Sequence, residues 1–301
     1  MLRITGHKFP VYSLAFSPDS RTLASGSRKE VKLWEAGTNT EKATLKGHRE
    51  GVACLAFSPD GRFLASAGWD GGVCLWDVIS SKKMHRWRTG EWGKGPGASI
   101  AFSPDSKTLA SGYYPAPEWE GPQRDVLVWD LSTYKQLQVW SSEGEKRFCS
   151  VSSLAWSPDG RMLALSSFSG IYLLGVKPTL QKRWSQKKQY ADSLAWAPDG
   201  TSLAVAVART IELWDVVAGT RLKVLTGHKA RVSSIAFSPG GETLLSASFD
   251  GIVCAWDLKT GQKKVAWKWS VGKPCCVAVS PNGMLAACGG TGRAFVVWDL
   301  A

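Results

Sequence analysis

The chain has 301 residues, of which 44% are hydrophobic and sixteen are tryptophan, and its formal net charge is +12. This apolar content is enough for a large core. The apolar runs fall short of the roughly eighteen residues that a membrane helix needs, and no charged-then-apolar leader opens the chain. We therefore expect neither a membrane span nor secretion.

Seven cysteines make an odd count, and none of them belongs to a Cys-x-x-Cys motif. Four histidines are too few to complete a metal cage. We therefore expect reduced, mostly buried thiols, no metal, no cofactor and a cytoplasmic setting. Cys275 and Cys276 are neighbours that would point to opposite faces of a strand, so two packing roles are favoured over a redox pair.

One short phrase recurs seven times: an apolar residue, a small residue, Pro, usually Asp, and then Gly or Ser. Its prolines are Pro18, Pro59, Pro104, Pro158, Pro198, Pro239 and Pro281. Pro, Asp and Gly supply turn geometry, and apolar runs such as residues 11–16 and 22–25 stand on either side. Each phrase therefore predicts a β-hairpin, and a period of about forty residues predicts a repeat architecture.

Two further markers follow the same period. A β-rich run that ends in Trp-Asp closes five copies, at Trp76-Asp77, Trp129-Asp130, Trp214-Asp215, Trp256-Asp257 and Trp298-Asp299. Copy one has Trp34-Glu35 instead, and copy four has lost the marker. A Gly-His pair opens three copies, at Gly6-His7, Gly47-His48 and Gly227-His228.

This trio of markers resembles the WD-repeat family of β-propellers over essentially the whole chain. The resemblance implies one four-stranded antiparallel blade per repeat and a buried network of Asp, His, Ser and Trp inside a blade. Copy two matches that network with His48, Ser66, Asp70 and Trp76, and copy six matches it with His228, Ser246, Asp250 and Trp256. Copy one keeps His7, Ser25 and Trp34 but has no Asp in its third turn.

The predicted fold is therefore all-β: a seven-bladed β-propeller of four-stranded antiparallel blades, in one domain that covers residues 1–301. The chain ends on a third strand, and residues 2–5 stand just before a Gly-His, where an outer strand stands in a later copy. We expect residues 2–5 to complete the last blade and close the ring, which would leave no open sheet edge there.

The positive charge is concentrated in three segments without acidic residues: 80–89, 177–188 and 259–268. Each follows a Trp-Asp position, so the three should form the outer strands of blades two, four and six. Alternating blades cannot build one compact patch, and a dispersed belt favours solvated, protected edges. The alternative is a basic rim that binds nucleic acid or acidic lipid, with the outer-strand tryptophans stacking on bases.

The search for catalytic motifs assigns no catalytic residue. Residues 93–98 formally fit a dinucleotide fingerprint, but a strand follows them where a helix is required. His7, His48 and His228 occupy the position of the blade network, which favours a structural role. Paired carboxylates stay open, because neighbours in space are not visible in a sequence.

Departures from the repeat point to one face, the top face of the propeller. Copy three has an insertion at residues 113–124, and long loops at 89–97 and 141–149 precede copies three and four. Insertions in repeat proteins often mark the binding face. The position just before the network Asp is also aromatic or Arg in several copies, which are types enriched in interface hot spots. The candidate partner-binding residues are Arg28, Trp69, Trp92, Tyr113, Tyr114, Trp119, Phe168, Arg209 and Phe249.

The first hypothesis is a non-catalytic, monomeric scaffold that binds a protein or peptide on the top face near blades two to four. The second is binding of an anionic surface through the basic rim. A third is an enzyme with a site in the central channel. For Trp69, Phe168 and Phe249 a plain packing role over the network stays open as well.

Overall fold

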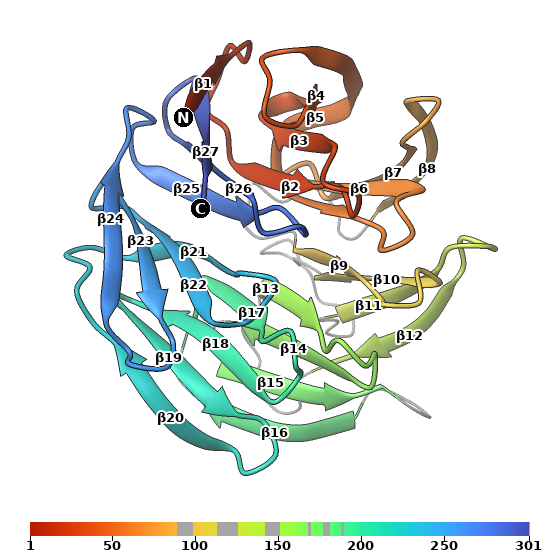
Figure 1. Cartoon of the computed structure of the whole chain (residues 1–301). Coiled ribbons are helices and arrows are strands. Elements are labelled where there is room, and N and C mark those ends of the chain that lie inside the picture. The colour runs from red at the N-terminus through yellow and green to blue at the C-terminus, as the bar shows by residue number, and fades with distance from the viewer. Residues whose placement is uncertain are drawn as a thin grey trace.

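The computed structural model describes residues 1–88, 99–112, 126–141, 151–167, 170–176, 181–187 and 190–300. All regular secondary structure in these residues is β-strand, and the strands form antiparallel sheets that follow one another around the molecule in chain order (Figure 1). Most of the sheets have four strands, which is consistent with a propeller.

The first sheet along the chain has seven strands. Their order is β2 (Ser13–Phe16), β3 (Thr22–Gly26), β4 (Arg28–Glu35), β5 (Glu41–Phe57), β6 (Phe63–Gly68), β7 (Gly72–Asp77) and β8 (Lys82–Arg88). Strand β5 is long because residues 47–51 stay extended, and Gly51 still pairs with Arg28. Its first half pairs with β4 and its second half with β6, so two four-stranded units share one strand. The repeat pattern predicts separate four-stranded units, and this junction differs from that expectation.

The other sheets each have four strands. The next sheet contains β9 (Ile100–Phe102), β10 (Thr108–Gly112), β11 (Val126–Asp130) and β12 (Gln136–Trp140). It is followed by β13 (Val151–Trp156), β14 (Met162–Ser167), β15 (Gly170–Gly175) and β16 (Gln181–Lys187). The next two contain β17 (Ser193–Trp196), β18 (Ser202–Val207), β19 (Thr210–Asp215) and β20 (Thr220–Leu225), then β21 (Val232–Phe237), β22 (Thr243–Ser248), β23 (Ile252–Asp257) and β24 (Lys263–Lys268).

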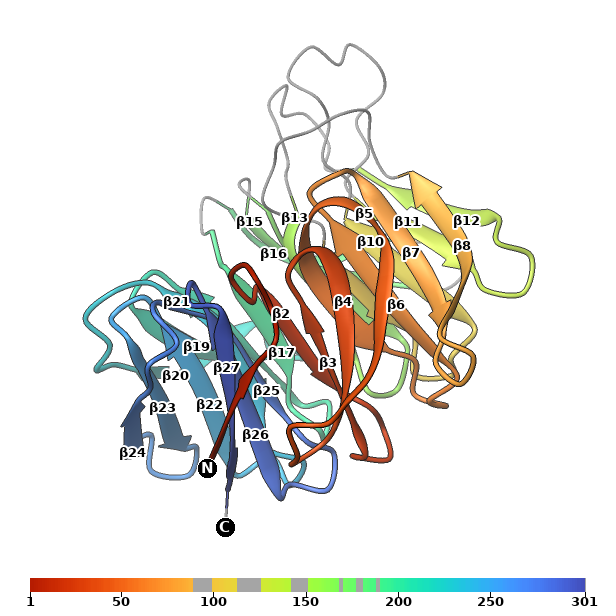
Figure 2. The same cartoon turned by 90° about the horizontal axis from the view of Figure 1, so that it is seen from above.

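The last sheet brings the two ends of the chain together. Its order is β1 (Leu2–Thr5), β27 (Ala294–Asp299), β26 (Leu285–Gly290) and β25 (Pro274–Val279). Leu2 pairs with Val297 and Thr5 with Ala294, so the N-terminal strand lies on the outer edge of the C-terminal hairpin. The two chain ends are neighbours in both views (Figures 1 and 2).

The recurring phrase forms the hairpin between the first two strands of a unit. In the first unit, the Ser17 hydroxyl donates to Asp19 Oδ1 at 2.5 Å, and Asp19 Oδ1 also accepts the Arg21 N–H at 3.0 Å. The Thr22 N–H donates to Ser17 Oγ at 2.9 Å, which closes the loop. Ser and Asp therefore satisfy the turn's backbone donors, and Gly61 shows the positive φ of 74° that the last position of the phrase adopts.

The same phrase also joins neighbouring units. A Cβ at Gly61 would lie 3.9 Å from Pro18 Cδ of the preceding unit, and one at Gly160 would lie 3.5 Å from Pro104 Cδ. Where Ser replaces Gly, its hydroxyl makes the link instead: Ser106 Oγ accepts the Asp60 N–H at 3.0 Å. The phrase is therefore both a turn and a contact between sheets, and only the turn was predictable from the residues of the phrase.

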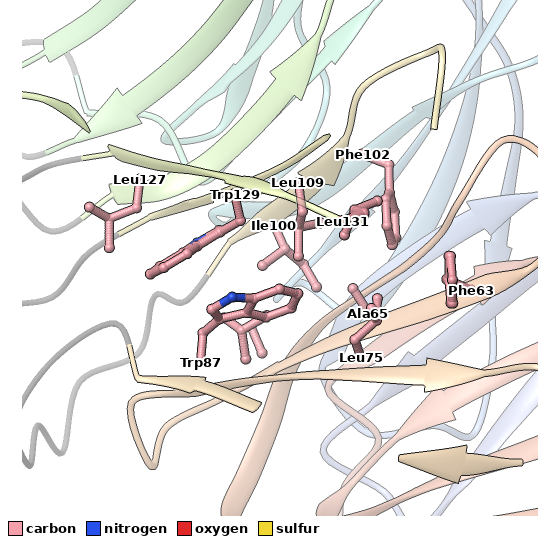
Figure 3. Close-up of a cluster of buried hydrophobic side chains, with 12 residues drawn as sticks. Phe63, Ala65, Leu75, Trp87, Ile100, Phe102, Leu109, Leu127, Trp129 and Leu131 are labelled. Atoms are coloured by element: carbon pink, nitrogen blue, oxygen red, sulfur yellow. The ribbon is translucent and has the colours of Figure 1, made fainter. Parts of the chain in front are cut away.

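The hydrophobic core lies between the sheets. Residues of β6–β8 and β9–β11 form one such layer, in which Trp87 lies 5.6 Å from Trp129 between ring centroids (Figure 3). Trp87 belongs to a basic outer strand and is only 4% exposed. Its indole N–H donates to the Tyr134 carbonyl at 2.9 Å. Packing therefore accounts for this outer-strand tryptophan without a stacked base.

Candidate functional site

Antiparallel order sends two kinds of connection to the same end of every sheet. One joins the second and third strands of a unit, and the other leads from an outer strand to the next inner strand. We call both kinds the upper loops, and we include the adjoining residues 28–29 of β4 and the extended residues 47–51 of β5. The described stretches are residues 6–12, 27–29, 47–51, 69–71, 190–192, 208–209, 226–231, 249–251, 269–273 and 291–293. Hydrogen bonds join the two kinds of loop within a copy. The Trp69 N–H donates to Gly51 O at 2.9 Å, and the Phe249 N–H donates to Arg231 O at 3.0 Å.

A buried hydrogen-bond network supports the upper loops of copy two. The Trp76 indole N–H donates to Ser66 Oγ at 2.8 Å, and His48 Nε2 lies 2.8 Å from the same oxygen. His48 Nδ1 lies 3.1 Å from Asp70 Oδ1. The Asp70 carboxylate also accepts the Arg49 N–H and an Arg86 N–H, at 2.7 and 2.9 Å. The network therefore ties an upper loop to the third strand and to the outer strand.

Charge and burial compete at this His–Asp pair. Burial by itself lowers the pKa of His48, but its contact with Asp70 opposes burial and raises the pKa to about 9. Burial would raise the pKa of Asp70, but His48 and the surrounding N–H donors lower it to about 2. Both groups are therefore ionised at neutral pH, which suits a structural ion pair and leaves no proton to exchange near pH 7.

Copy six repeats the arrangement without the extra arginine. His228 Nε2 lies 2.7 Å from Ser246 Oγ, and the Trp256 indole N–H donates to that oxygen at 2.8 Å. His228 Nδ1 lies 2.9 Å from Asp250 Oδ2, which also accepts the Lys229 N–H at 2.9 Å.

Two units replace the missing network residues with glutamate. In copy one, His7 Nδ1 lies 3.0 Å from Glu30 Oε1. Glu30 stands one residue after the position that the aspartate occupies in copy two, and it takes the role of that aspartate. In copy five, Glu212 accepts the Trp214 indole N–H at 3.0 Å and an Arg221 N–H at 3.0 Å. Alignment of the repeats does not reveal either residue, because neither glutamate occupies the position of the network aspartate.

Trp69 bridges two units at the upper loops. Its ring centroid lies 4.6 Å from that of Tyr12, and a Cβ at Gly51 would come within 2.5 Å of its Cε3 atom. Burial raises the pKa of the Tyr12 hydroxyl, and Cys275 raises it further, whereas Arg28 lowers it. Cys275 and Arg28 are therefore both within electrostatic range of the Tyr12 hydroxyl.

Arg28 and Phe9 form a second contact in this region. The Arg28 guanidinium carbon lies 5.1 Å from the Phe9 ring centroid, and Phe9 is 42% exposed. Ser27 Oγ donates to the Phe9 carbonyl at 3.1 Å, which joins the two loops. We call Phe9, Tyr12, Arg28 and Trp69 the aromatic cluster.

The remaining described candidates lie apart from the aromatic cluster. Phe249 is 37% exposed in copy six, and Arg209 is exposed in a tight turn after Ala208, whose φ is 49°. The other predicted binding residues lie outside the described residues, and they are Trp92, Tyr113, Tyr114, Trp119 and Phe168.

Three residues of the upper loops are not among the candidates that the sequence pattern indicates. Phe9 and Tyr12 belong to the aromatic cluster, and Arg231 pairs with Asp192 and lies 5.4 Å from the Tyr190 ring centroid. A signal existed for Tyr12, which stands where aligned copies have Ala53, Ser152, Ser233 and Cys275. A side chain much larger than its counterparts in a repeat is an outlier that alignment can detect.

The described residues also bear on metal and membrane roles. In the ranges given above, no three His, Cys, Asp or Glu side chains gather as a metal site would require. Nor does any helix in those ranges have the length and apolar character to cross a membrane.

Comparison with known proteins identifies the family. The family model for "WD domain, G-beta repeat" matches residues 1–35, 39–77, 135–171 and 219–257. The chain belongs to the WD40 repeat family. WD40 repeats typically serve as protein-interaction scaffolds and are generally non-catalytic.

This WD40 chain has distant curated relatives. It is 27% identical over 293 residues to cell division cycle 20.4, cofactor of APC complex, from Arabidopsis thaliana, covering 89% of this chain and 62% of the relative. It is 25% identical to the WD repeat-containing protein 26 homolog of the same plant, covering 99% and 50%. Transcription initiation factor TFIID subunit 5 of Caenorhabditis elegans is 27% identical, covering 54% and 24%. The chain thus spans less than two thirds of each relative.

Proposed function

We propose that this WD40 chain is a non-catalytic scaffold that binds a protein or peptide partner at its upper loops, on the side of copies two to four. The aromatic cluster, which lies on copies one and two at the border of that side, carries this proposal. Aromatic and arginine side chains dominate interface hot spots because they offer large contact areas at a small cost in side-chain entropy. Here the three aromatic residues stand on loops, where binding residues concentrate, and Arg28 begins β4 beside them.

The frame beneath the cluster favours binding without rearrangement. Trp69 is fixed by its N–H bond to Gly51 O and by Tyr12, and the His48–Asp70 pair anchors the next residues of the same loop. A preorganised surface loses less conformational entropy on binding than a mobile one.

We further propose that the sheets form a closed ring of seven blades in one domain, residues 1–301. Contacts between the first and last units support closure. The Cys276 thiol donates to Val11 O at 3.9 Å, the Val11 N–H donates to Gly290 O at 3.0 Å, and the Asn282 N–H donates to Ser20 Oγ at 3.1 Å. Equivalent contacts join the units that are consecutive in the chain, as between Leu194 N–H and Ser153 Oγ at 3.0 Å.

The names of the relatives agree with a role in an assembly. One is named a cofactor of the APC complex and another a subunit of TFIID. We propose by analogy that this chain also works inside a multiprotein assembly, without assigning it to either of these two.

Affinity capture from the native cell tests the proposal. We expect Trp69→Ala and Arg28→Ala to reduce recovery of the captured partner at least about fivefold, as loss of a hot-spot side chain does. Ile79→Ala and Val217→Ala serve as controls, because both side chains are 92% exposed and stand in turns at the opposite end of their sheets. Thermal unfolding shows that each variant is folded. Equal recovery with all four variants would reject the upper loops as the binding face.

A further inference from the structure

The two ends of the sheets carry different charges. Acidic residues stand in the turns between first and second strands, and at the ends of third strands that lead into the next turn. They include Asp19, Asp60, Asp105, Asp130, Asp215 and Asp257. These carboxylates accept hydrogen bonds from the turn itself, and the Ser132 and Thr133 donors lower the pKa of Asp130 to about 2. Antiparallel order therefore places many of the carboxylates at the end opposite the upper loops.

The upper loops from copy five round to copy one are basic. Six of the exposed cations on them are called the basic crescent here: Arg209, Lys229, Lys273, Arg293, Lys8 and Arg28. None of these six forms an ion pair within 4 Å among the described residues. The sequence does not reveal this surface, because the net charge of a stretch of sequence adds the acidic turns to the basic loops.

Acidic side chains in the same region are engaged by neighbours. The Asp192 side chain is 9% exposed and pairs with Arg231, and the Asp250 side chain is 7% exposed beside His228. Glu30 is held by His7. The charge that this surface presents to solvent is therefore mainly positive.

Hydrogen bonds join the loops of the crescent in sequence. Starting at copy five, the Val232 N–H donates to Ala208 O at 2.7 Å, and Ser233 Oγ donates to Pro274 O at 2.8 Å. The Thr291 N–H donates to Lys273 O at 3.0 Å, which links copy seven's two loops. The bond from the Val11 N–H to Gly290 O and the bond from Ser27 Oγ to the Phe9 carbonyl then continue the run to copy one. The six cations therefore stand on one connected run of loops.

We propose that the basic crescent binds an extended acidic segment of the partner protein, rich in Asp and Glu with an interspersed apolar residue. This rests on the proposed function and names the chemistry of its partner. Complementary charge steers such a segment to the upper loops and sets its orientation. Phe249 and Phe9, exposed along the same run, offer an apolar contact to it.

The spacing of the cations favours a peptide over a nucleic acid. Each cation belongs to a separate loop, and the Arg28 guanidinium already lies over the Phe9 ring. Nucleic-acid affinity depends on several clustered cations that displace counterions from consecutive phosphates. A peptide needs fewer charge contacts, because apolar side chains supply part of its affinity.

A labelled peptide tests the inference directly. The probe is a fluorescein-labelled twelve-residue peptide of Asp, Glu and Gly with one central Phe, followed by fluorescence anisotropy at 50 and 150 mM salt. The crescent variant combines Arg209→Glu, Lys229→Glu, Lys273→Glu and Arg293→Glu. The matched control combines Lys259→Glu, Lys263→Glu, Lys264→Glu and Lys268→Glu, which changes net charge equally on exposed positions in and beside β24.

We expect the crescent variant to weaken peptide binding at least about tenfold and the control by less than about threefold. Equal weakening by both variants would mean non-specific charge attraction and would overturn the inference, as would no weakening by either. A single-stranded 20-mer DNA that binds more tightly than the peptide and loses affinity only in the crescent variant would also overturn it. If the peptide does not bind but Trp69→Ala still reduces recovery of the partner in affinity capture, the proposed function stands and only the acidic segment is rejected.

Discussion

At the scale of single residues, the His48–Asp70 pair links stability to pH. His48 has a raised pKa, so its contribution to stability is complete below about pH 6.5 and is lost as pH rises through about 9. Asp70 has a lowered pKa, so its contribution is complete above about pH 4 and is lost as pH falls through about 2. The pair therefore stabilises the fold most between about pH 4 and 6.5.

Asp70→Asn should remove the alkaline part of this dependence. Without the carboxylate, burial favours neutral His48, so we expect the free energy of unfolding to fall by up to ~3 kcal/mol at pH 6. The loss of stability between pH 6.5 and 9 should shrink in the variant. Urea unfolding at pH 6, 7.5 and 9 measures both effects. Glu50→Gln, at an exposed position, is the control, and an unchanged pH profile in Asp70→Asn would contradict the assignment.

Glu30→Ala tests the glutamate that takes the place of the network aspartate in copy one. The His7 ring is buried and Glu30 is its Nδ1 partner, so loss of the carboxylate leaves a buried polar atom unsatisfied. We expect unfolding to become easier by about 1–2 kcal/mol. Glu35→Ala, at an exposed position in the same strand, should change stability by less than about 0.5 kcal/mol. Similar melting temperatures for the two variants would show that Glu30 is a bystander.

The role of Glu30 as the partner of His7 could not be predicted from the sequence, because it depends on the backbone conformation of the turn. Asp70 stands four residues after Ser66, but the residue four after Ser25 is Lys29. Lys29 adopts a φ of 66°, and this left-handed residue lets the turn present Glu30 instead. Turn geometry therefore decides which residue reaches the histidine.

At the scale of elements, strand β1 contributes to the fold through one buried side chain. Ile4 is 1% exposed and packs in a cluster with Trp34, Phe295 and Leu14, which belong to the first and last units. Its neighbour Arg3 points to solvent. The alternation matches a half-buried edge strand, and residues 2–5 were predicted from the sequence as this outer strand.

Ile4→Ala should therefore destabilise the whole chain. Truncation of a buried Ile typically costs about 2–5 kcal/mol, whereas Arg3→Ala should cost less than about 0.5 kcal/mol. Chemical denaturation of both variants makes the comparison. An Ile4→Ala variant as stable as Arg3→Ala would argue against a ring that depends on the N-terminal strand.

At the scale of the whole molecule, the basic outer strands stand on separate sheets. Strands β8, β16 and β24 each lie at a sheet end, so their charges do not line a single groove. We expect the outer-strand lysine variant described above to elute from a heparin column at a salt concentration close to that of the crescent variant, because both lower net charge equally. A markedly earlier elution of the outer-strand variant would favour the basic rim as a polyanion site.

The candidate site was predictable only in part. The sequence alone identified Trp69, Arg28, Arg209 and Phe249 as candidates, because they stand beside turns at aligned positions. It did not bring Arg28 together with Phe9, or Trp69 with Tyr12. The first contact joins two loops of copy one and the second joins copies one and two, so both depend on packing between segments that local pattern does not relate.

The sequence by itself determined the repeat, its turns, its all-β class and the strand that joins the chain ends, because hairpin chemistry and alternation are local. Tertiary structure decided the rest. It made the Ser-Pro-Asp-Gly phrase a contact between neighbouring units, put Glu30 and Glu212 into buried networks, and separated acidic turns from basic upper loops. Each of these depends on which residues distant in the sequence meet in space, and antiparallel order and side-chain packing together settle that.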